Sequence, residues 1–139
     1  MSACEFHDTE FALHDRRLFE IVEQAYRKLE KVLIFARSVE RAEAIDRFLW
    51  VLKQEAFIPH KVLAGQEDDC EVPVGIVTAE INPLGASVLI ADGHCSLEFA
   101  AGFDSIHEFV DRSSPDRQEA CRSRFRAYRA RKIPVEYSK

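Results

Sequence analysis

KVLIFA, residues 31–36, is the stretch that decides the fold, because a continuous apolar run here separates two segments with helical periodicity. Its β-branched and aromatic side chains are typical of a strand that is covered on both faces. Strands of this kind occur mainly in parallel sheets that have helices on either side. The run therefore predicts a central strand of an α/β domain.

The segments on either side of this strand have the spacing of amphipathic helices. In residues 14–30, apolar side chains recur at i, i+3, i+4 and i+7, which places one stripe on a helix of about four turns; the stripe is Leu18, Ile21, Val22, Ala25 and Leu29. After the strand, Ser38 is a good N-cap and Glu40 suits the helix dipole. A second helix is expected to run to about Leu52, with its stripe on Ala42, Ile45, Leu49 and Leu52.

The single tryptophan, Trp50, lies on the second predicted helix but away from its apolar stripe. At about 100° per residue, its side chain points roughly 100° or more from that stripe. An indole left half exposed beside the turn formed by Phe57, Ile58 and Pro59 would make an apolar patch, which is typical of a protein-binding surface. Alternatively, the loop at Phe57 folds back over Trp50, and periodicity does not decide between the two.

Further along the chain, strand patterns continue and a last helix follows. Strands are expected at residues 72–79, 87–91 and 105–111, and residues 113–116 (SSPD) supply the chemistry of a helix start. The chain has 139 residues, which fits a single domain over residues 1–139. Together these elements predict a three-layer α/β fold with a mostly parallel central sheet flanked by helices.

The last predicted helix, residues 117–132, has a charge opposite to that of the rest of the chain. It carries seven basic residues and one acidic residue, so subtracting +6 from the total of -5 leaves -11 for the remainder. This asymmetry indicates that one face meets an anionic partner.

On this helix Cys121, Phe125, Tyr128 and Lys132 share one line, and Arg122, Arg126 and Arg129 flank it. Such a surface suits a peptide that is both acidic and hydrophobic, although a basic stripe suits phosphates equally well. The alternative is a solvated basic face with Phe125 packed in the core.

Several classes of site are disfavoured by what the sequence lacks. No GxGxxG or GxxxxGK[ST] loop follows a predicted strand, so we expect no nucleotide-binding loop and no cofactor. The cysteines are scattered without a CxxC pair, and the histidines lack helical partners, so we expect no metal site. No apolar run approaches the roughly 18 residues of a membrane span, and the N-terminus lacks the pattern of a signal peptide, so a cytoplasmic protein without membrane contact is expected.

His94 and Cys95 form the one candidate pair for nucleophilic catalysis in an α/β enzyme. Neighbours in sequence rarely present both side chains to one substrate atom, and no third group that orients the base is evident. An activated thiolate at Cys95 would react unusually fast with a thiol reagent. The enzyme therefore stays an alternative to a binding protein.

Two motifs in this chain resemble the chi subunit of bacterial DNA polymerase III. AIDRFLWVLKQEAFIPHKVLAG, residues 44–65, is similar to a segment of that family in which a Leu-Trp pair ends a helix and a Phe-x-Pro-His turn follows. RSRFRAYR, residues 122–129, is similar to the basic-aromatic C-terminal helix of the family. A looser likeness covers most of the chain from Lys31 onward, whereas the first thirty residues match only in pattern.

The resemblance implies a non-enzymatic accessory of the clamp loader with a Rossmann-like fold that binds no nucleotide. It implies that the last helix binds the acidic, hydrophobic-ending C-terminal tail of single-stranded-DNA-binding protein; carried over by position, the site residues are Arg122, Phe125, Arg126 and Arg129. The family often has Tyr and Lys in place of Phe125 and Arg126, so the ring and the charge are kept while a phenolic hydrogen bond is lost.

A second surface would bind the psi subunit, and its residues by resemblance are Trp50, Phe57, Ile58 and Pro59. Association with DNA would then be indirect. Direct binding of single-stranded DNA, with bases stacked on Phe125 or Tyr128, is the remaining alternative. The charge of -11 on the rest of the chain disfavours it.

Overall fold

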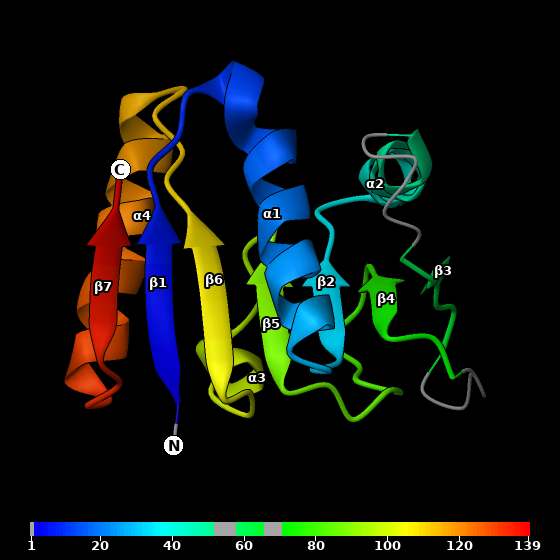
Figure 1. Cartoon of the computed structure of the whole chain (residues 1–139). Helices are drawn as coiled ribbons and strands as arrows, with labels where there is room; N and C mark the ends of the chain where they lie inside the picture. The colour runs from blue at the N-terminus through cyan, green and yellow to red at the C-terminus, as the bar shows by residue number, and fades with distance from the viewer. Residues whose placement is uncertain (1, 52–57, 66–70) are drawn as a thin grey trace.

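Seven strands form one sheet in the computed structural model, which describes residues 2–51, 58–65 and 71–139 (Figure 1). In chain order the strands are β1 (Ala3–His7), β2 (Val32–Phe35), β3 (His60–Val62), β4 (Val74–Val77), β5 (Val88–Ala91), β6 (Ser105–Phe109) and β7 (Val135–Ser138). Across the sheet they lie in the order β3-β4-β2-β5-β6-β1-β7. Every pair of neighbouring strands is parallel, as the sequence predicts for most of the sheet.

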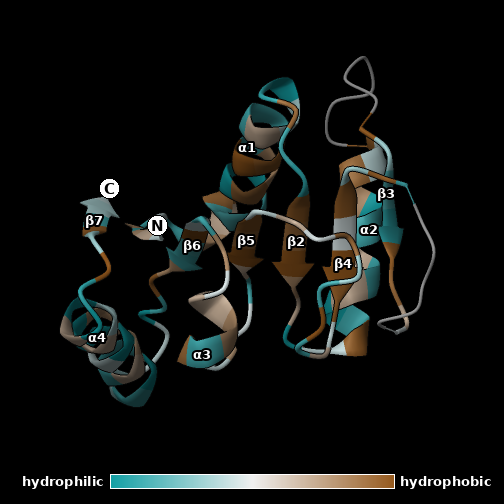
Figure 2. Ribbon diagram, turned by 90° about the horizontal axis from the view of Figure 1, so that it is seen from below, coloured by the Kyte–Doolittle hydropathy of each residue, from teal (hydrophilic) through white to brown (hydrophobic). Residues whose placement is uncertain are grey.

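Helices cover both faces of this sheet, which confirms the predicted three-layer α/β fold (Figures 1 and 2). They are α1 (His14–Arg27), α2 (Val39–Val51), α3 (Leu97–Ala100) and α4 (Pro115–Ala130), with a short 3-10 helix, η1 (Phe11–Leu13), before α1. One apolar cluster joins α1 and α2 to the sheet, and a second joins α3 and α4 to its other face. In the described part of the chain, no helix is both long enough and apolar enough to cross a membrane.

The central strand β2 is apolar throughout because both of its faces are buried. Val32 and Ile34 belong to the cluster beneath α1 and α2, and Leu33 belongs to the cluster beneath α3 and α4. All three side chains are fully buried, and each such burial contributes about 1.5–3 kcal/mol. Figure 2 shows the hydrophobic colour along β2 and β5 and along most of β4, so KVLIFA is the core strand that its composition predicts.

The first helix ends earlier than its periodicity predicts. Leu29 is 92% exposed and has a positive φ of 61°, so it lies just beyond the helix and not on the buried stripe. The other four residues of that stripe are buried. On α2, Ala42, Ile45 and Leu49 are buried as predicted, and Leu52 lies outside the described residues.

The sequence predicts no residue range for three of the strands, namely β1, β3 and β7. The strands β3 and β7 form the two edges of the sheet and carry exposed residues such as Lys61 and Glu136, so their hydrophobic signal is weak. The last helix starts as predicted, because Ser114 is its N-cap, accepts a hydrogen bond from the Arg117 N–H at 3.1 Å and is followed by Pro115.

Candidate peptide-binding site

The helix α4 has one face turned to the sheet and one turned to solvent. Cys121 and Tyr128 are buried on the inner face. On the outer face, the side chains of Arg122 and Arg126 are each 63% exposed. The inner face of this basic helix therefore fixes the position of the outer face.

A buried network attaches the inner face of α4 to β6. Arg124 donates from Nε and Nη2 to the two carboxylate oxygens of Glu108 at 3.1 and 2.6 Å, and from Nη1 to the carbonyl oxygen of Cys95 at 2.7 Å. Tyr128 donates its hydroxyl hydrogen to Glu108 at 2.6 Å. Burial and the Glu108 carboxylate raise the pKa of Tyr128. The hydrogen bonds that Arg124 donates to Glu108 outweigh burial and raise the pKa of Arg124. Arg124 is therefore a structural residue.

The outer face carries arginines that are paired only at the surface. Glu119 lies 3.9 Å from Arg122 and 2.8 Å from Arg126, and its own side chain is 57% exposed. Exposed ion pairs of this kind contribute about 0–1 kcal/mol. A ligand carboxylate can therefore compete with Glu119 for either guanidinium.

A groove of about 290 Å³ runs beside these arginines, close to the lower end of the roughly 300–1,000 Å³ range of ligand pockets. Phe6, Val110 and Phe125 are among its apolar lining, and Arg122 and Arg126 line it from α4. Arg129 is exposed but does not line the groove. The structure thus brings together three of the four residues predicted for a tail site.

Phe125 both packs against the core and lines the groove, which are the two roles that the sequence left open. Its ring packs against the buried ring of Phe6, with 5.3 Å between the ring centroids, and it joins the cluster beneath α4. It is only half-buried, and its remaining surface lines the groove. Phe125 therefore belongs to the edge of the core and offers an apolar shelf to a ligand.

The sequence did not identify Arg112 and Tyr137, which also line the groove. Arg112 donates from Nε to Asp8 at 3.1 Å and from Nη2 to the Tyr137 hydroxyl at 3.1 Å, and its side chain is 53% exposed. The hydrogen bonds from Arg112 lower the pKa of Asp8. These residues are far apart in the sequence and meet only because β1 pairs with both β6 and β7.

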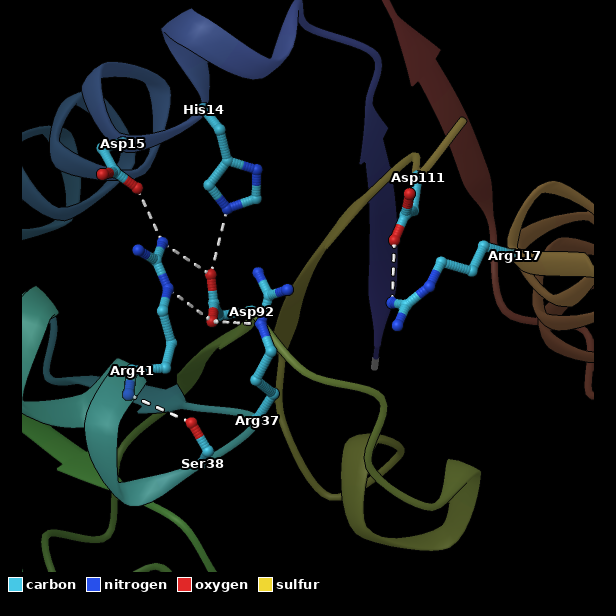
Figure 3. Close-up of polar contacts among 8 residues, drawn as sticks. All are labelled: His14, Asp15, Arg37, Ser38, Arg41, Asp92, Asp111 and Arg117. Atoms are coloured by element: carbon cyan, nitrogen blue, oxygen red, sulfur yellow. Dashed lines mark hydrogen bonds and ion pairs between the residues drawn. The ribbon is translucent and has the colours of Figure 1, made fainter. Parts of the chain in front are cut away.

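The carboxyl ends of β2 and β5 form the crevice in which doubly wound sheets usually bind nucleotides, and here the protein's own ion pairs fill it (Figure 3). Asp92 accepts hydrogen bonds from Nε and Nη2 of Arg41, each at 2.9 Å, and its carboxylate lies 3.0 Å from His14 Nε2. These hydrogen bonds outweigh burial and lower the pKa of Asp92 from 3.8 to about 2. The backbone is also tight here, since a Cβ on Gly93 would lie 2.8 Å from the Cα of Arg37.

The structure does not support the roles that the two alternatives give to Cys95 and to Tyr128. Cys95 is 3% exposed, and burial together with Glu108 raises its pKa to about 11, so it is not an activated thiolate. His94 is exposed beside it. Tyr128 is fully buried, so it offers no surface on which a nucleic-acid base can stack.

The Trp50 surface lies at the other end of the sheet, where α2 meets β3. Trp50 is 45% exposed, which is the first of the two arrangements that periodicity left open, and its ring centroid lies 4.2 Å from that of His60. His60 is held by carbonyl groups, with Nδ1 2.8 Å from Ile58 O and Nε2 3.0 Å from Asp46 O. Ile58 is 2% exposed and packs in the core, so its side chain is not part of the patch. Pro59 is half-buried, and Phe57 lies outside the described residues.

Fold and site together define a class: a parallel three-layer α/β protein with a filled nucleotide crevice and a candidate peptide groove on a basic helix. Comparison with known proteins then identifies the family. The family described as "DNA polymerase III chi subunit, HolC" matches residues 1–136, and the chain belongs to it. The match includes the first thirty residues, which the sequence motifs left in doubt.

Two relatives are named DNA polymerase III subunit chi. The one from Pseudomonas aeruginosa is 30% identical over 119 residues, which are 84% of this chain and 79% of the relative. The one from Escherichia coli (strain K12) is 31% identical over 111 residues, which are 79% of this chain and 74% of the relative. The chain is thus a subunit of the replicative polymerase assembly, with a role in DNA replication.

Proposed function

We propose that this protein is a non-catalytic adaptor of the clamp loader that binds the acidic C-terminal tail of single-stranded-DNA-binding protein in the α4 groove. The observation that carries the proposal is the groove itself, which has an apolar lining and the exposed guanidiniums of Arg112, Arg122 and Arg126 around it. That combination fits a peptide that ends in an apolar residue with a free carboxylate.

In the proposed complex, the terminal side chain of the tail packs on Phe125. The terminal carboxylate of the tail and its nearby acidic side chains accept hydrogen bonds from Arg122 and Arg126. The two arginines give up their ion pairs with Glu119 to make these bonds. Hydrogen bonds to charged groups contribute about 1.5–3 kcal/mol each. Because both arginines are 63% exposed, we expect binding on the order of micromolar affinity that weakens as salt screens the charges.

The proposal is tested by titrating a fluorescent tail peptide and recording its anisotropy. Arg122→Ala is expected to weaken binding about 10-fold, equal to about 1.4 kcal/mol, without lowering the melting temperature. Arg131→Ala is the matched control, because Arg131 is exposed near Glu98 and does not line the groove. A peptide with an amidated C-terminus should also bind more weakly. Equal affinity of wild type and Arg122→Ala would reject the proposed site.

We further propose that the Trp50 surface binds the psi subunit. A half-exposed indole held against a fixed histidine ring is the kind of aromatic anchor that supplies much of an interface's energy. Trp50→Ala should abolish co-purification with psi and leave the affinity for the tail peptide unchanged. Loss of both partners would instead indicate general destabilisation.

Direct binding of single-stranded DNA is a second candidate, favoured by the exposed row of Arg122, Arg126 and Arg129. An oligonucleotide titration without any partner protein separates the two functions. Tight binding that Arg122→Ala weakens would favour DNA as the direct ligand. We expect weak binding, because the rest of the chain is acidic.

A further inference from the structure

Glu5, His7 and His107 come together on the sheet face opposite to the peptide groove. Glu5 and His7 alternate on β1 with Cys4 and Phe6, whose side chains pack in the cluster beneath α4. The register of the sheet places His107 of β6 directly beside Glu5. All three side chains line a polar pocket of about 320 Å³ that Glu20 and Gln24 of α1 also line.

The ligating atoms of these three side chains form a small triangle. His7 Nε2 lies 2.9 Å from His107 Nδ1, and Glu5 Oε1 lies 3.8 Å from the first nitrogen and 3.9 Å from the second. A point equidistant from the three atoms is about 2.1 Å from each, which matches Zn–N distances of about 2.0–2.1 Å and Zn–O distances of about 2.0–2.2 Å. The three ligating atoms are therefore close enough together to bind one metal ion.

The surroundings hold this arrangement in place. The second carboxylate oxygen of Glu5 accepts a hydrogen bond from the Ser138 hydroxyl on β7, an outer contact of the kind that orients metal ligands. His7 is only 3% exposed and lies inside a paired strand.

We propose that Glu5 Oε1, His7 Nε2 and His107 Nδ1 bind one divalent transition-metal ion of the zinc class, with its remaining coordination position open to the pocket. Two imidazoles and one carboxylate form a donor set that suits zinc and its first-row neighbours. The ion would join β1 to β6 and stabilise the folded state. It would do so independently of peptide binding, because the groove lies on the other face of the sheet.

The competing account is a hydrogen-bonded pair of histidines without metal. In that account His7 donates from Nε2 to His107, and Nη1 of Arg17, 3.4 Å from His7 Nδ1, donates to the other ring nitrogen. Metal binding requires the opposite tautomer of His7, with the proton on Nδ1, and Arg17 must then turn toward Glu20, 3.7 Å from its Nε. The two accounts therefore differ in which ring nitrogen of His7 carries the proton, and this can be measured.

The test is equilibrium dialysis of tag-free, chelator-treated full-length protein against Zn²⁺, with bound zinc measured by mass spectrometry. We expect about one ion per chain, and Co²⁺ substitution should give ligand-field absorption bands. Histidine nitrogen NMR should place the His7 proton on Nδ1 after zinc is added. The Zn²⁺-loaded protein should also melt at a higher temperature than the metal-free protein.

Three variants locate the site. His107→Ala should abolish the bound ion, and Glu5→Gln, which keeps the shape of the side chain, should weaken affinity by about 10-fold or more. His94→Ala, which removes an exposed histidine outside the cluster, should bind as the wild type does. Should His107→Ala fail to fold, Glu5→Gln decides. Absence of binding at about 100 μM zinc, or unchanged binding in Glu5→Gln, overturns the proposal.

Discussion

The two faces of α4 use the same residue type in opposite ways. Arg124, on the inner face, is 13% exposed and is held by a Glu108 carboxylate that is 1% exposed. Arg122 and Arg126, on the outer face, are 63% exposed and share one exposed glutamate. Burial and the number of fixed partners, and not the residue type, therefore separate an arginine that holds the helix in place from one that is available to a ligand.

The largest expected effect comes from removing the carboxylate on the inner face of α4. Glu108→Ala leaves the Arg124 charge buried without its carboxylate, and removal of one partner of a buried ion pair costs about 3–5 kcal/mol. Urea-induced unfolding, followed by circular dichroism, measures this loss in the free energy of unfolding.

Glu119→Ala is the matched variant on the outer face of the helix. It removes the carboxylate shared by Arg122 and Arg126, and we expect a change within about 0.5 kcal/mol, as for most surface substitutions. Similar losses in the two variants would show that burial does not distinguish the two faces.

Arg41 is a second largely buried arginine, and its carboxylate partner is Asp92. The pKa of Asp92 is lowered to about 2, so its ionised form stabilises the folded state above the ordinary value of 3.8. That contribution, about 2 kcal/mol, is lost as the pH falls from about 4 to about 2.

Unfolding free energies between pH 5 and about pH 2 test this dependence. The advantage of wild type over Asp92→Asn should shrink as Asp92 takes up its proton. A constant difference between the two proteins over this range would show that Asp92 stabilises the fold through hydrogen bonds alone. Glu119→Gln should show a smaller change over the same range, because its carboxylate is exposed.

Much of the fold follows from sequence because its central elements are defined by local pattern. The strand β2 is continuous and apolar since both faces are covered, and the stripe of α1 is read directly from Leu18, Ile21, Val22 and Ala25. The edge strands give no such signal. The end of α1 was misplaced because Leu29 fits the apolar period, whereas a positive φ there ends the helix.

Less of the candidate sites follows from the sequence. Spacing on one helix identifies Arg122, Phe125 and Arg126, which also line the groove. It does not identify Arg112 or Tyr137, because strand pairing brings them to the groove from distant segments. Strand pairing also brings Glu5, His7 and His107 together. These residues are on two strands and share no period, so the sequence does not identify the cluster. The local sign of this cluster in the sequence is that Glu5 and His7 are two residues apart, so they share one face of a strand.

The last and smallest effect concerns whether Glu119 competes with a ligand or prepares the site for it. The adaptor proposal requires that the outer arginines are not consumed by the chain's own carboxylates. If Glu119 only competes, Glu119→Gln frees both arginines and should raise tail-peptide affinity about 2-fold, in line with the 0.2–1 kcal/mol of exposed ion pairs. The gain should vanish at high salt, where such pairs are screened. Glu98→Gln, which changes the carboxylate near Arg131, should have no effect. A fall in affinity for Glu119→Gln would instead show that Glu119 orients Arg126 toward the groove.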